Sequence, residues 1–255
     1  IILVSEQKDI IIDRKRQKRA VMIRLENVCF AYEKEIALRY VDLHINRGDS
    51  IVIQGPNGCG KSTLGRVVIK LLDGAEGEVF FEGRDILKEK NTFELRRNLQ
   101  MIFQDPFSSL NPRMTVGETI SEPMLINHLC SKNEAVERVF SLMDTVGLAE
   151  RFINSYPHEL DGGRRQRVGI ARVLALNPKF IVCDEPVSAL DVSIRAQVLN
   201  LMQDLQDKFG FTYLFITHDL SVVKHISDDI IVMYLGKIVE KAPAKKLFAN
   251  PVHPY

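Results

Sequence analysis

The pattern of apolar and polar positions predicts strands that alternate with helices over most of the chain. Seven short apolar segments have strand character, and turn residues such as Arg47-Gly48-Asp49 separate some of them. Helices are predicted over 61–72, over about 164–176, and over a later segment that ends at Gly210. The predicted strands cover residues 22–30, 36–45, 50–54, 78–81, 180–183, 213–217 and 230–234.

The middle of the chain, residues 93–160, has a pattern that predicts a block of helices. Ser131 followed by Glu134 is the signature of a capping box, and Gly147 provides the expected helix end. An alternating strand and helix pattern with such a block inside predicts an α/β core interrupted by a helical subdomain over about 93–164. The residues expected on one buried helix face are Val136, Val139, Phe140 and Met143.

Composition restricts the classes of function. The 255 residues suffice for one α/β domain with an inserted subdomain. The 34 Lys and Arg residues nearly balance 33 Asp and Glu residues, and a net charge of +1 argues against a nucleic-acid partner. The four cysteines form no CxxC pair, which argues against a disulfide framework or zinc site and favours a reducing cytosol. No run approaches 18 apolar residues, so we expect any membrane role to pass through a partner.

Residues 1–21 are expected to be a basic extension before a domain at 22–255, because Met22 is a plausible start. The apolar start of the chain is too short for a signal peptide and has no basic segment before it. The run Arg14-Lys15-Arg16-Gln17-Lys18-Arg19 is interpreted as a solvated tail, with contact to anionic lipid as the alternative.

A phosphate-binding motif of the form GxxxxGKS lies between the strand at 50–54 and the helix at 61–72. Glycines let backbone N–H groups converge on phosphate oxygens, and the helix N-terminus adds partial positive charge. Lys61 is expected to reach the β- and γ-phosphates of ATP, and Ser62 to ligate Mg²⁺. Cys59 is either a thiol whose pKa is lowered beside Lys61 or a small residue that fits the loop. The candidate nucleotide-binding residues here are Gly55, Pro56, Asn57, Gly58, Cys59, Gly60, Lys61, Ser62 and Thr63.

Two carboxylates, Asp184 and Glu185, follow the apolar strand at 180–183. Downstream of a phosphate-binding loop, Asp184 is the expected partner of Mg²⁺ and Glu185 the base that orients water. The alternative is simple solvation of a strand end. A carboxylate directly after the magnesium-side Asp favours a hydrolase over a protein that only binds nucleotide.

Further motifs resemble those of ABC ATPases, in the order of that family, over residues 22–241. The resemblance implies a P-loop NTPase core with a mainly parallel sheet, an antiparallel β subdomain and an inserted helical subdomain. Four segments carry the resemblance. The family's signature motif, at the start of its helix, corresponds to Leu160-Asp161-Gly162-Gly163-Arg164, and its Q-loop corresponds to Phe103-Gln104-Asp105-Pro106. Its D-loop corresponds to Ser188-Ala189-Leu190-Asp191, and its switch histidine corresponds to His218 in Thr217-His218-Asp219.

The resemblance also implies roles for these residues. His218 contacts the γ-phosphate, and Gln104 takes part in catalysis, senses Mg²⁺ and contacts the membrane subunit. Tyr32 stands where the family stacks an aromatic ring on adenine, although a core or surface tyrosine is the alternative. Nucleotide contacts across a head-to-tail dimer are implied for Asp161, Gly162, Gly163 and Asp191.

The signature departs from the family's LSGGQ, since Asp161 replaces Ser and Arg164 replaces Gln. A carboxylate there faces the γ-phosphate of the other subunit, at a cost of about 4 kcal/mol for each unit-charge pair at ~4 Å and an effective dielectric of ~20, which Arg164 offsets in part. Asp161 is equally interpreted as the cap of the signature helix, and both roles are compatible. We expect the site closed by Asp161 to be poor and this chain's own site to be competent.

A finer resemblance, to the oligopeptide, dipeptide and nickel importer branch, implies the partners. It rests on residues 104–114, 185–193 and 250–255. It implies a second, F-type ATPase subunit that works with a D-type ATPase subunit, two integral-membrane permease subunits and, indirectly, an extracytoplasmic solute-binding protein. The implied location is the cytoplasmic face of the membrane. Branch members continue past the His-Pro-Tyr segment, so we expect this chain to be truncated.

Two other functions are compatible with these motifs. A ribosome-associated or DNA-repair ATPase typically has tandem cassettes or a long coiled-coil insertion, and this sequence shows neither pattern. A subunit that binds ATP and barely hydrolyses it is disfavoured by Glu185 and His218, and favoured by Asp161 at the other site. The leading interpretation is ATP hydrolysis coupled to solute import through a separate membrane subunit.

Overall fold

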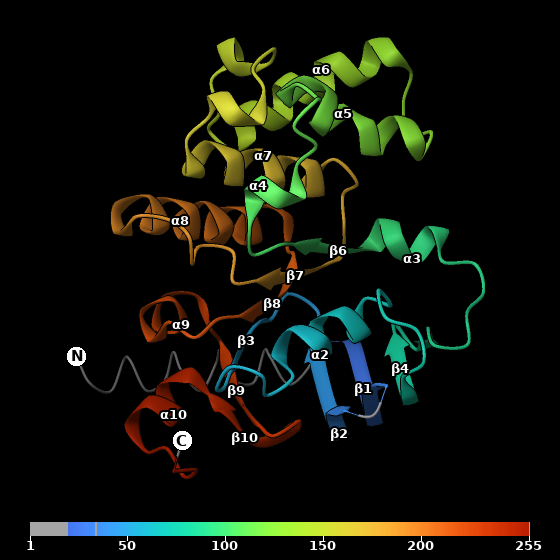
Figure 1. Cartoon of the computed structure of the whole chain (residues 1–255), viewed down its shortest axis with the longest axis vertical. Helices are drawn as coiled ribbons and strands as arrows, with labels where there is room; N and C mark the ends of the chain where they lie inside the picture. Colours follow the sequence, from blue (N-terminus) through green and yellow to red (C-terminus); the bar gives the residue numbers. More distant parts are fainter. Residues whose placement is uncertain (1–19, 34, 255) are drawn as a thin grey trace.

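The computed structural model describes residues 20–33 and 35–254, so the predicted basic run at 14–19 lies outside the described residues. The described chain forms two β-sheets with helices around them (Figure 1). The strands are β1 (Val21–Tyr32), β2 (Glu35–Asn46), β3 (Ser50–Gln54), β4 (Glu76–Phe81), β5 (Arg84–Asp85), β6 (Leu99–Ile102), β7 (Phe180–Asp184), β8 (Thr212–Ile216), β9 (Asp229–Tyr234) and β10 (Lys237–Pro243). The helices are α2 (Lys61–Val68), α3 (Phe93–Asn98), α4 (Pro106–Ser109), α5 (Val116–Ile126), α6 (Lys132–Thr145), α7 (Gly162–Leu174), α8 (Val192–Phe209), α9 (Leu220–Ile226) and α10 (Ala244–Ala249), with short 3-10 helices η1 (Glu150–Phe152) and η2 (Pro157–Glu159).

The larger sheet positions the candidate site. Its strand order is β10-β9-β3-β8-β7-β6, and all neighbouring pairs are parallel except β10 and β9. Every residue of β3, β7 and β8 is buried, as expected for parallel strands that are covered on both faces. Because Asp184 pairs with Ile216 and Ile102 with Cys183, the carboxyl ends of these strands meet at one edge.

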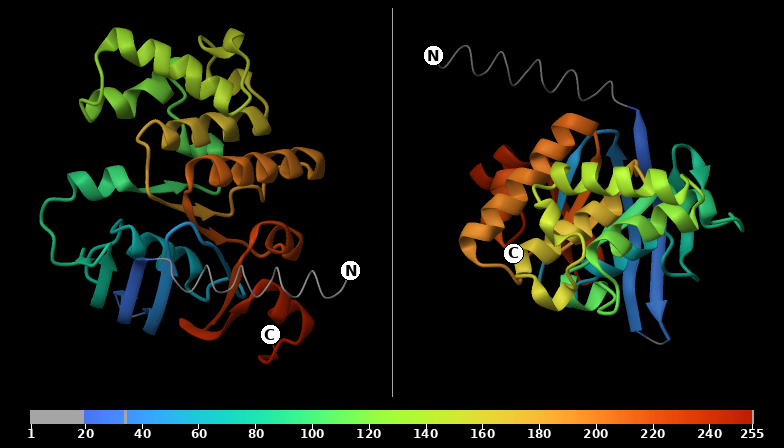
Figure 2. Two further views of the ribbon diagram at one scale, coloured as in Figure 1. Left: turned by 180° about the vertical axis from the view of Figure 1, so that it is seen from behind. Right: turned by 90° about the horizontal axis from the view of Figure 1, so that it is seen from above.

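Side chains of the central strands alternate between two hydrophobic cores. Val52 and Ile181 belong to a core shared with residues of α5 to α9, whereas Ile53 and Val182 belong to a core shared with α2 and the antiparallel sheet. The molecule is therefore layered, with helices α5 to α9 on one side of the larger sheet and α2 with the smaller sheet on the other, and Figure 2 shows the arrangement from behind and from above. The smaller sheet has the order β2-β1-β4-β5 and is antiparallel, as predicted.

The helical block lies at the end of the molecule farthest from the antiparallel sheet (Figures 1 and 2). The predicted capping box at α6 is confirmed, because Ser131 and Glu134 bond each other's backbone N–H. The predicted buried face is only partly right. Val136 is 52% exposed, because the buried stripe of α6 runs through Ala135, Val139 and Met143, four residues apart.

The fold corrects two predictions from the pattern and adds elements that the pattern did not predict. Residues 99–102, assigned to the helical block, form β6, which pairs with β7. The helix predicted over 61–72 ends at Val68, because Lys70 has a left-handed backbone with φ of 54°. Three elements near the C-terminus, α9, β10 and α10, were not predicted.

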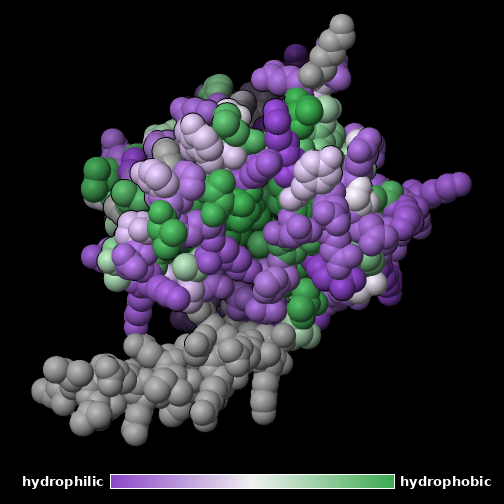
Figure 3. Space-filling model, turned by 90° about the horizontal axis from the view of Figure 1, so that it is seen from below, coloured by the Kyte–Doolittle hydropathy of each residue, from purple (hydrophilic) through white to green (hydrophobic). Residues whose placement is uncertain are grey.

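Apolar side chains form areas on the surface of the molecule. In Figure 3, which views the molecule from below, apolar residues gather near the centre among polar ones. Among the described residues, no helix is long and apolar enough to cross a bilayer.

Candidate functional site

The loop between β3 and α2 has the backbone that the GxxxxGKS motif predicts. Gly60 has φ of 101°, and a Cβ atom there would lie 2.5 Å from the carbonyl oxygen of Ala37, so only glycine fits. A Cβ atom at Gly55 would lie 2.3 Å from the carbonyl oxygen of Met233. Lys61 is buried, and its Nζ donates to the carbonyl oxygens of Gly55 and Pro56 at 2.8 and 2.9 Å. The lysine thus folds back over the loop.

Ser62 and Asp184 meet across the edge of the sheet. Ser62 is the second residue of α2, and its Oγ donates to Oδ1 of Asp184 at 2.8 Å. Asp184 is 4% exposed, and this burial raises the pKa of its carboxyl despite the hydrogen bond from Ser62. A hydroxyl and a carboxylate are ligands that fit Mg²⁺, which proteins bind with one or two carboxylates together with phosphate oxygens. The described residues contain no group of three or more His, Cys, Asp or Glu side chains placed to hold a metal.

Glu185 is held between two other candidate residues. Its Oε2 accepts a hydrogen bond from Nε2 of Gln104 at 2.9 Å, and its Oε1 lies 2.9 Å from Nδ1 of His218. These side chains come from the segments after β7, β6 and β8, which share one sheet edge. The Glu185 backbone has φ of 47°, a strained conformation for a non-glycine residue that clusters at functional sites. The fold brings the three predicted catalytic residues together.

Tyr32 borders the same cleft at the end of β1. The residue is 44% exposed. Its ring packs edge-on against Phe30 with centroids 4.9 Å apart, and its hydroxyl lies 3.5 Å from Oγ1 of Thr63. The cleft has a volume of about 640 Å³, within the usual range for small-molecule sites. Sequence reasoning missed Glu35, Ile36 and Ala37, whose only signal was their position just after Tyr32. The predicted residues that line the cleft are Tyr32, Asn57, Gly58, Gly60, Lys61, Ser62, Thr63, Gln104, Glu185 and His218.

The signature and D-loop residues lie outside this cleft. Asp161 and Gly163 line a separate hollow of about 290 Å³, and Asp191 precedes α8 without a side-chain capping bond. Asp161 is the N-cap of α7, since its Oδ1 accepts from the backbone N–H of Arg164 at 2.8 Å. Its Oδ2 forms an ion pair with Nη1 of Arg164 at 2.7 Å. The capping interpretation is confirmed, and the carboxylate is paired within its own chain.

Cys59 does not have the activated thiol that one interpretation predicts. The residue is 3% exposed, and burial raises the pKa of its thiol more than the nearby charge of Lys61 lowers it. The expectation of a lowered pKa is therefore wrong, and the interpretation as a small residue that fits the loop stands.

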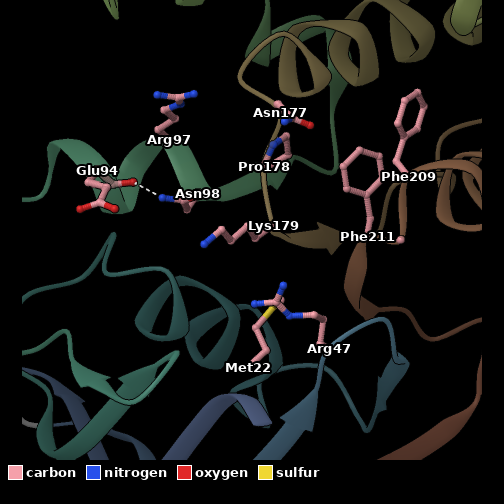
Figure 4. Close-up of a pocket in the computed structure, with 11 residues that line it drawn as sticks. Met22, Arg47, Glu94, Arg97, Asn98, Asn177, Pro178, Lys179, Phe209 and Phe211 are labelled. Carbon is pink, nitrogen blue, oxygen red and sulfur yellow. Dashed lines mark hydrogen bonds between the residues drawn. The ribbon is translucent and has the colours of Figure 1, made fainter. Parts of the chain in front are cut away.

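A hollow of about 460 Å³ with basic side chains around it lies at the amino ends of the strands, at the opposite edge of the larger sheet from the nucleotide cleft (Figure 4). Arg97, Lys179 and Arg47 surround it, near the amino ends of β6 and β7. Glu82 forms ion pairs with both Arg47 and Lys179, so much of the positive charge is compensated. The hollow lies away from the nucleotide cleft, which is at the carboxyl ends of the same strands.

Comparison with known proteins gives consistent matches. A family model described as "ABC transporter" matches residues 38–188. The chain is 55% identical over 215 residues to the oligopeptide transport ATP-binding protein OppF of Bacillus subtilis (strain 168), covering 83% of this chain and 70% of the relative. It is 49% identical over 229 residues to the dipeptide transport ATP-binding protein DppF of Escherichia coli (strain K12), covering 89% and 69%. Among solved structures, the dimeric ATP-binding cassette MJ0796, in a post-hydrolysis state bound to ADP and Pi, matches with a TM-score of 0.78 and 32% identity, covering 88% of this chain and 99% of that one.

Proposed function

The chain belongs to the ABC transporter family, and from this premise we propose that it is the ATP-hydrolysing subunit of an importer of peptides or related small solutes. The names of two relatives, an oligopeptide and a dipeptide transport ATP-binding protein, support the solute class. The proposed cassette spans 22–255, with its helical subdomain at about 93–164.

ATP is proposed to lie in the cleft beside the GxxxxGKS loop. Tyr32 is exposed at the border of the cleft and offers an aromatic ring on which adenine can stack, and its hydroxyl near Thr63 places this end of the cleft next to the phosphate loop. Lys61 exchanges the carbonyl oxygens of Gly55 and Pro56 for the β- and γ-phosphates, which offer a stronger charge-assisted partner. The loop's N–H groups and the start of α2 hold the phosphate oxygens.

Glu185 is proposed to orient the attacking water and to accept its proton. Its fixed position between Gln104 and His218 aims the carboxylate into the cleft that Lys61 also lines. Ser62 and Asp184, together with Gln104, are the residues that would hold Mg²⁺, which supplies neutralisation of charge on the phosphate oxygens. His218, whose Nδ1 lies 2.9 Å from Oε1 of Glu185, is proposed to contact the γ-phosphate.

The arrangement of Glu185, Gln104 and His218 at 2.9 Å carries this proposal. Glu185→Gln keeps size and hydrogen bonding but removes the proton acceptor. In the assembled complex we expect ATP binding to be retained, a closed dimer to be stabilised and turnover to fall by about 10²-fold or more. Glu137→Gln, at an exposed position on α6, is the matched control. Parental turnover in the Glu185→Gln variant would falsify the assignment.

We propose that the chain acts as a heterodimer with a second, D-type ATPase subunit, bound to two permease subunits at the cytoplasmic face of the membrane and served indirectly by an extracytoplasmic solute-binding protein. The dimeric state of the similar cassette supports a two-cassette assembly. In it, the loop at Asp161, Gly162 and Gly163, with Asp191, closes the partner's ATP site. Because Asp161 places a carboxylate there, that site is proposed to work poorly, while this chain's own site works with an ordinary partner signature.

A further inference from the structure

Arg195 joins two loops that border the proposed catalytic cleft. It lies in the first turn of α8, where its backbone N–H donates to the carbonyl oxygen of Asp191 at 2.8 Å. Its Nη1 forms an ion pair with the carboxylate of Asp219, and its Nη2 donates to the carbonyl oxygen of Leu190 at 3.3 Å. Leu190 and Asp191 end the loop before α8, and Asp219 directly follows His218. One side chain thus contacts both loops.

The ion pair is sheltered enough to hold its geometry. The side chains of Arg195 and Asp219 are 24% and 28% exposed, whereas the side chain of His218, next to Asp219 in the same loop, is 58% exposed. A guanidinium presents a rigid planar fork of donors, so it fixes the direction of a carboxylate better than an ammonium does. The position of Asp219 is therefore set by α8.

The loop that carries His218 is anchored on both sides of the histidine. On one side, the backbone N–H of Thr217 donates to the carbonyl oxygen of Ile53 at 3.3 Å, which ties the loop to β3. On the other side, Asp219 is tied to Arg195, and its N–H donates to Oγ1 of Thr217 at 3.1 Å. His218 itself contacts only Glu185 among the interactions of its side chain that the described residues show. Its placement therefore depends on these two anchors.

Two hydrogen bonds join α8 and α9 farther from the cleft. Nε2 of Gln203 donates to the carbonyl oxygen of His225 at 2.7 Å, and the His225 ring lies 2.8 Å from Oδ1 of Asn200. These bonds keep α9 against α8 independently of Arg195. Loss of the Arg195 ion pair is thus expected to release the His218 loop without separating the two helices.

We infer that Arg195 is a positioning residue for ATP hydrolysis, which holds His218 against Glu185 through Asp219 and couples it to the loop at 188–191. This inference rests on the proposed function, because it presumes that His218 acts at the γ-phosphate. A displacement of the 188–191 loop is passed to His218 through this side chain, whereas the phosphate grip of Lys61 does not depend on it.

The test uses Arg195→Gln, Asp219→Asn and the double variant in the complete transporter complex. We expect each single variant to lower kcat by about tenfold with the KM for ATP unchanged, and the double variant to lose no more than either single variant, because both remove one interaction. Arg195→Lys, which keeps the charge, should recover part of the loss. Lys208→Gln, at an exposed position near the other end of α8, is the control.

A background of His218→Ala separates positioning from a general structural effect. If Arg195 acts through His218, adding Arg195→Gln to His218→Ala changes kcat no further. A further tenfold loss in that background, a raised KM in the Arg195→Gln variant, or parental kcat in that variant overturns the inference. Parental kcat in His218→Ala alone instead overturns the proposed role of His218.

Discussion

Replacing Asp161 by Ser and Arg164 by Gln in the same chain should raise ATP hydrolysis by the purified chain. The unmodified chain is expected to be a feeble ATPase on its own. When the purified chain pairs head to tail with a second copy of itself, in place of the D-type partner, every site with an intact Lys61 and Glu185 is closed by the Asp161 loop of the other copy. The double substitution removes the carboxylate from both closures at once.

The size of the effect follows from the ion pair. A carboxylate at ~4 Å from the γ-phosphate costs about 4 kcal/mol for each unit-charge pair at an effective dielectric of ~20. The guanidinium of Arg164 lies 2.7 Å from that carboxylate. Placed behind it, at ~7 Å from the phosphate, it returns about 2.5 kcal/mol. The remaining ~1.5 kcal/mol corresponds to about tenfold in rate. Each further negative charge on the phosphate adds to this cost, while solvent screening of the two side chains, which are 48% and 43% exposed, reduces it, so about tenfold is the expected order of magnitude.

Single substitutions separate the charge from the helix cap. Ser caps a helix as well as Asp does, so Asp161→Ser should leave the free energy of unfolding nearly unchanged, whereas Asp161→Ala should lower it by about 1 kcal/mol. Arg164→Gln alone leaves the carboxylate unpaired and should lower turnover below that of the unmodified chain. Unfolding in urea and phosphate release by each purified variant measure the two effects separately.

The order of the variants by ATP turnover decides whether Asp161 repels the γ-phosphate or only caps the helix. Repulsion by Asp161 requires Arg164→Gln to be the slowest, the unmodified chain to be intermediate and the double variant to be the fastest. A vigorous ATPase from the unmodified chain would refute the asymmetric assembly. Equal turnover of the Arg164→Gln variant, the unmodified chain and the double variant would show that Asp161 serves only as a helix cap.

Three further predictions test other parts of the site and its surroundings. Lys61→Ala should weaken MgATP binding in calorimetry with the fold intact by circular dichroism, and unchanged affinity would exclude Lys61 from the phosphate grip. Phe107 of α4 is 52% exposed and lies three residues after Gln104, where we expect the membrane subunit to dock, so Phe107→Glu should abolish uptake while basal ATPase persists. Val136→Glu, at an equally exposed position on α6, should change neither, and normal uptake with Phe107→Glu would count against docking of the membrane subunit at α4. Cys59 should be alkylated by iodoacetamide more slowly than the half-buried Cys130, because burial both shields its thiol and raises its pKa, and faster alkylation of Cys59 would contradict that reasoning.

Sequence patterns predicted the parts of the site that depend on neighbouring residues. The GxxxxGKS loop needs glycine at fixed positions, and Asp184 and Glu185 sit at the end of a strand whose apolar run is unmistakable. The Ser131 capping box is likewise local, because both bonds join residues three apart. Such features are determined by a few neighbouring residues, so the structure shows them where the sequence predicts them.

Features that depend on distant residues were not predictable in the same way. The strand β6 has only four residues and owes its existence to pairing with β7, about 80 residues later. The ion pair of Arg195 and Asp219 joins the start of α8 to the His218 loop, and the pattern alone does not place these two segments together. The thiol pKa of Cys59 depends on how deeply the loop is buried, whereas the sequence shows only the neighbouring lysine.

The two contacts of Glu185 make ATP hydrolysis depend on two separate strands at once. Each carboxylate oxygen has two lone pairs, so one contact each, with Gln104 after β6 and with His218 after β8, leaves both oxygens able to accept a further proton. What the two contacts fix is the direction of the carboxylate, and a displacement of either segment changes that direction. With Glu185 as the proposed base, ATP is hydrolysed fast only while the ends of β6 and β8 are both in place, so a transporter in which either strand end is displaced consumes little ATP.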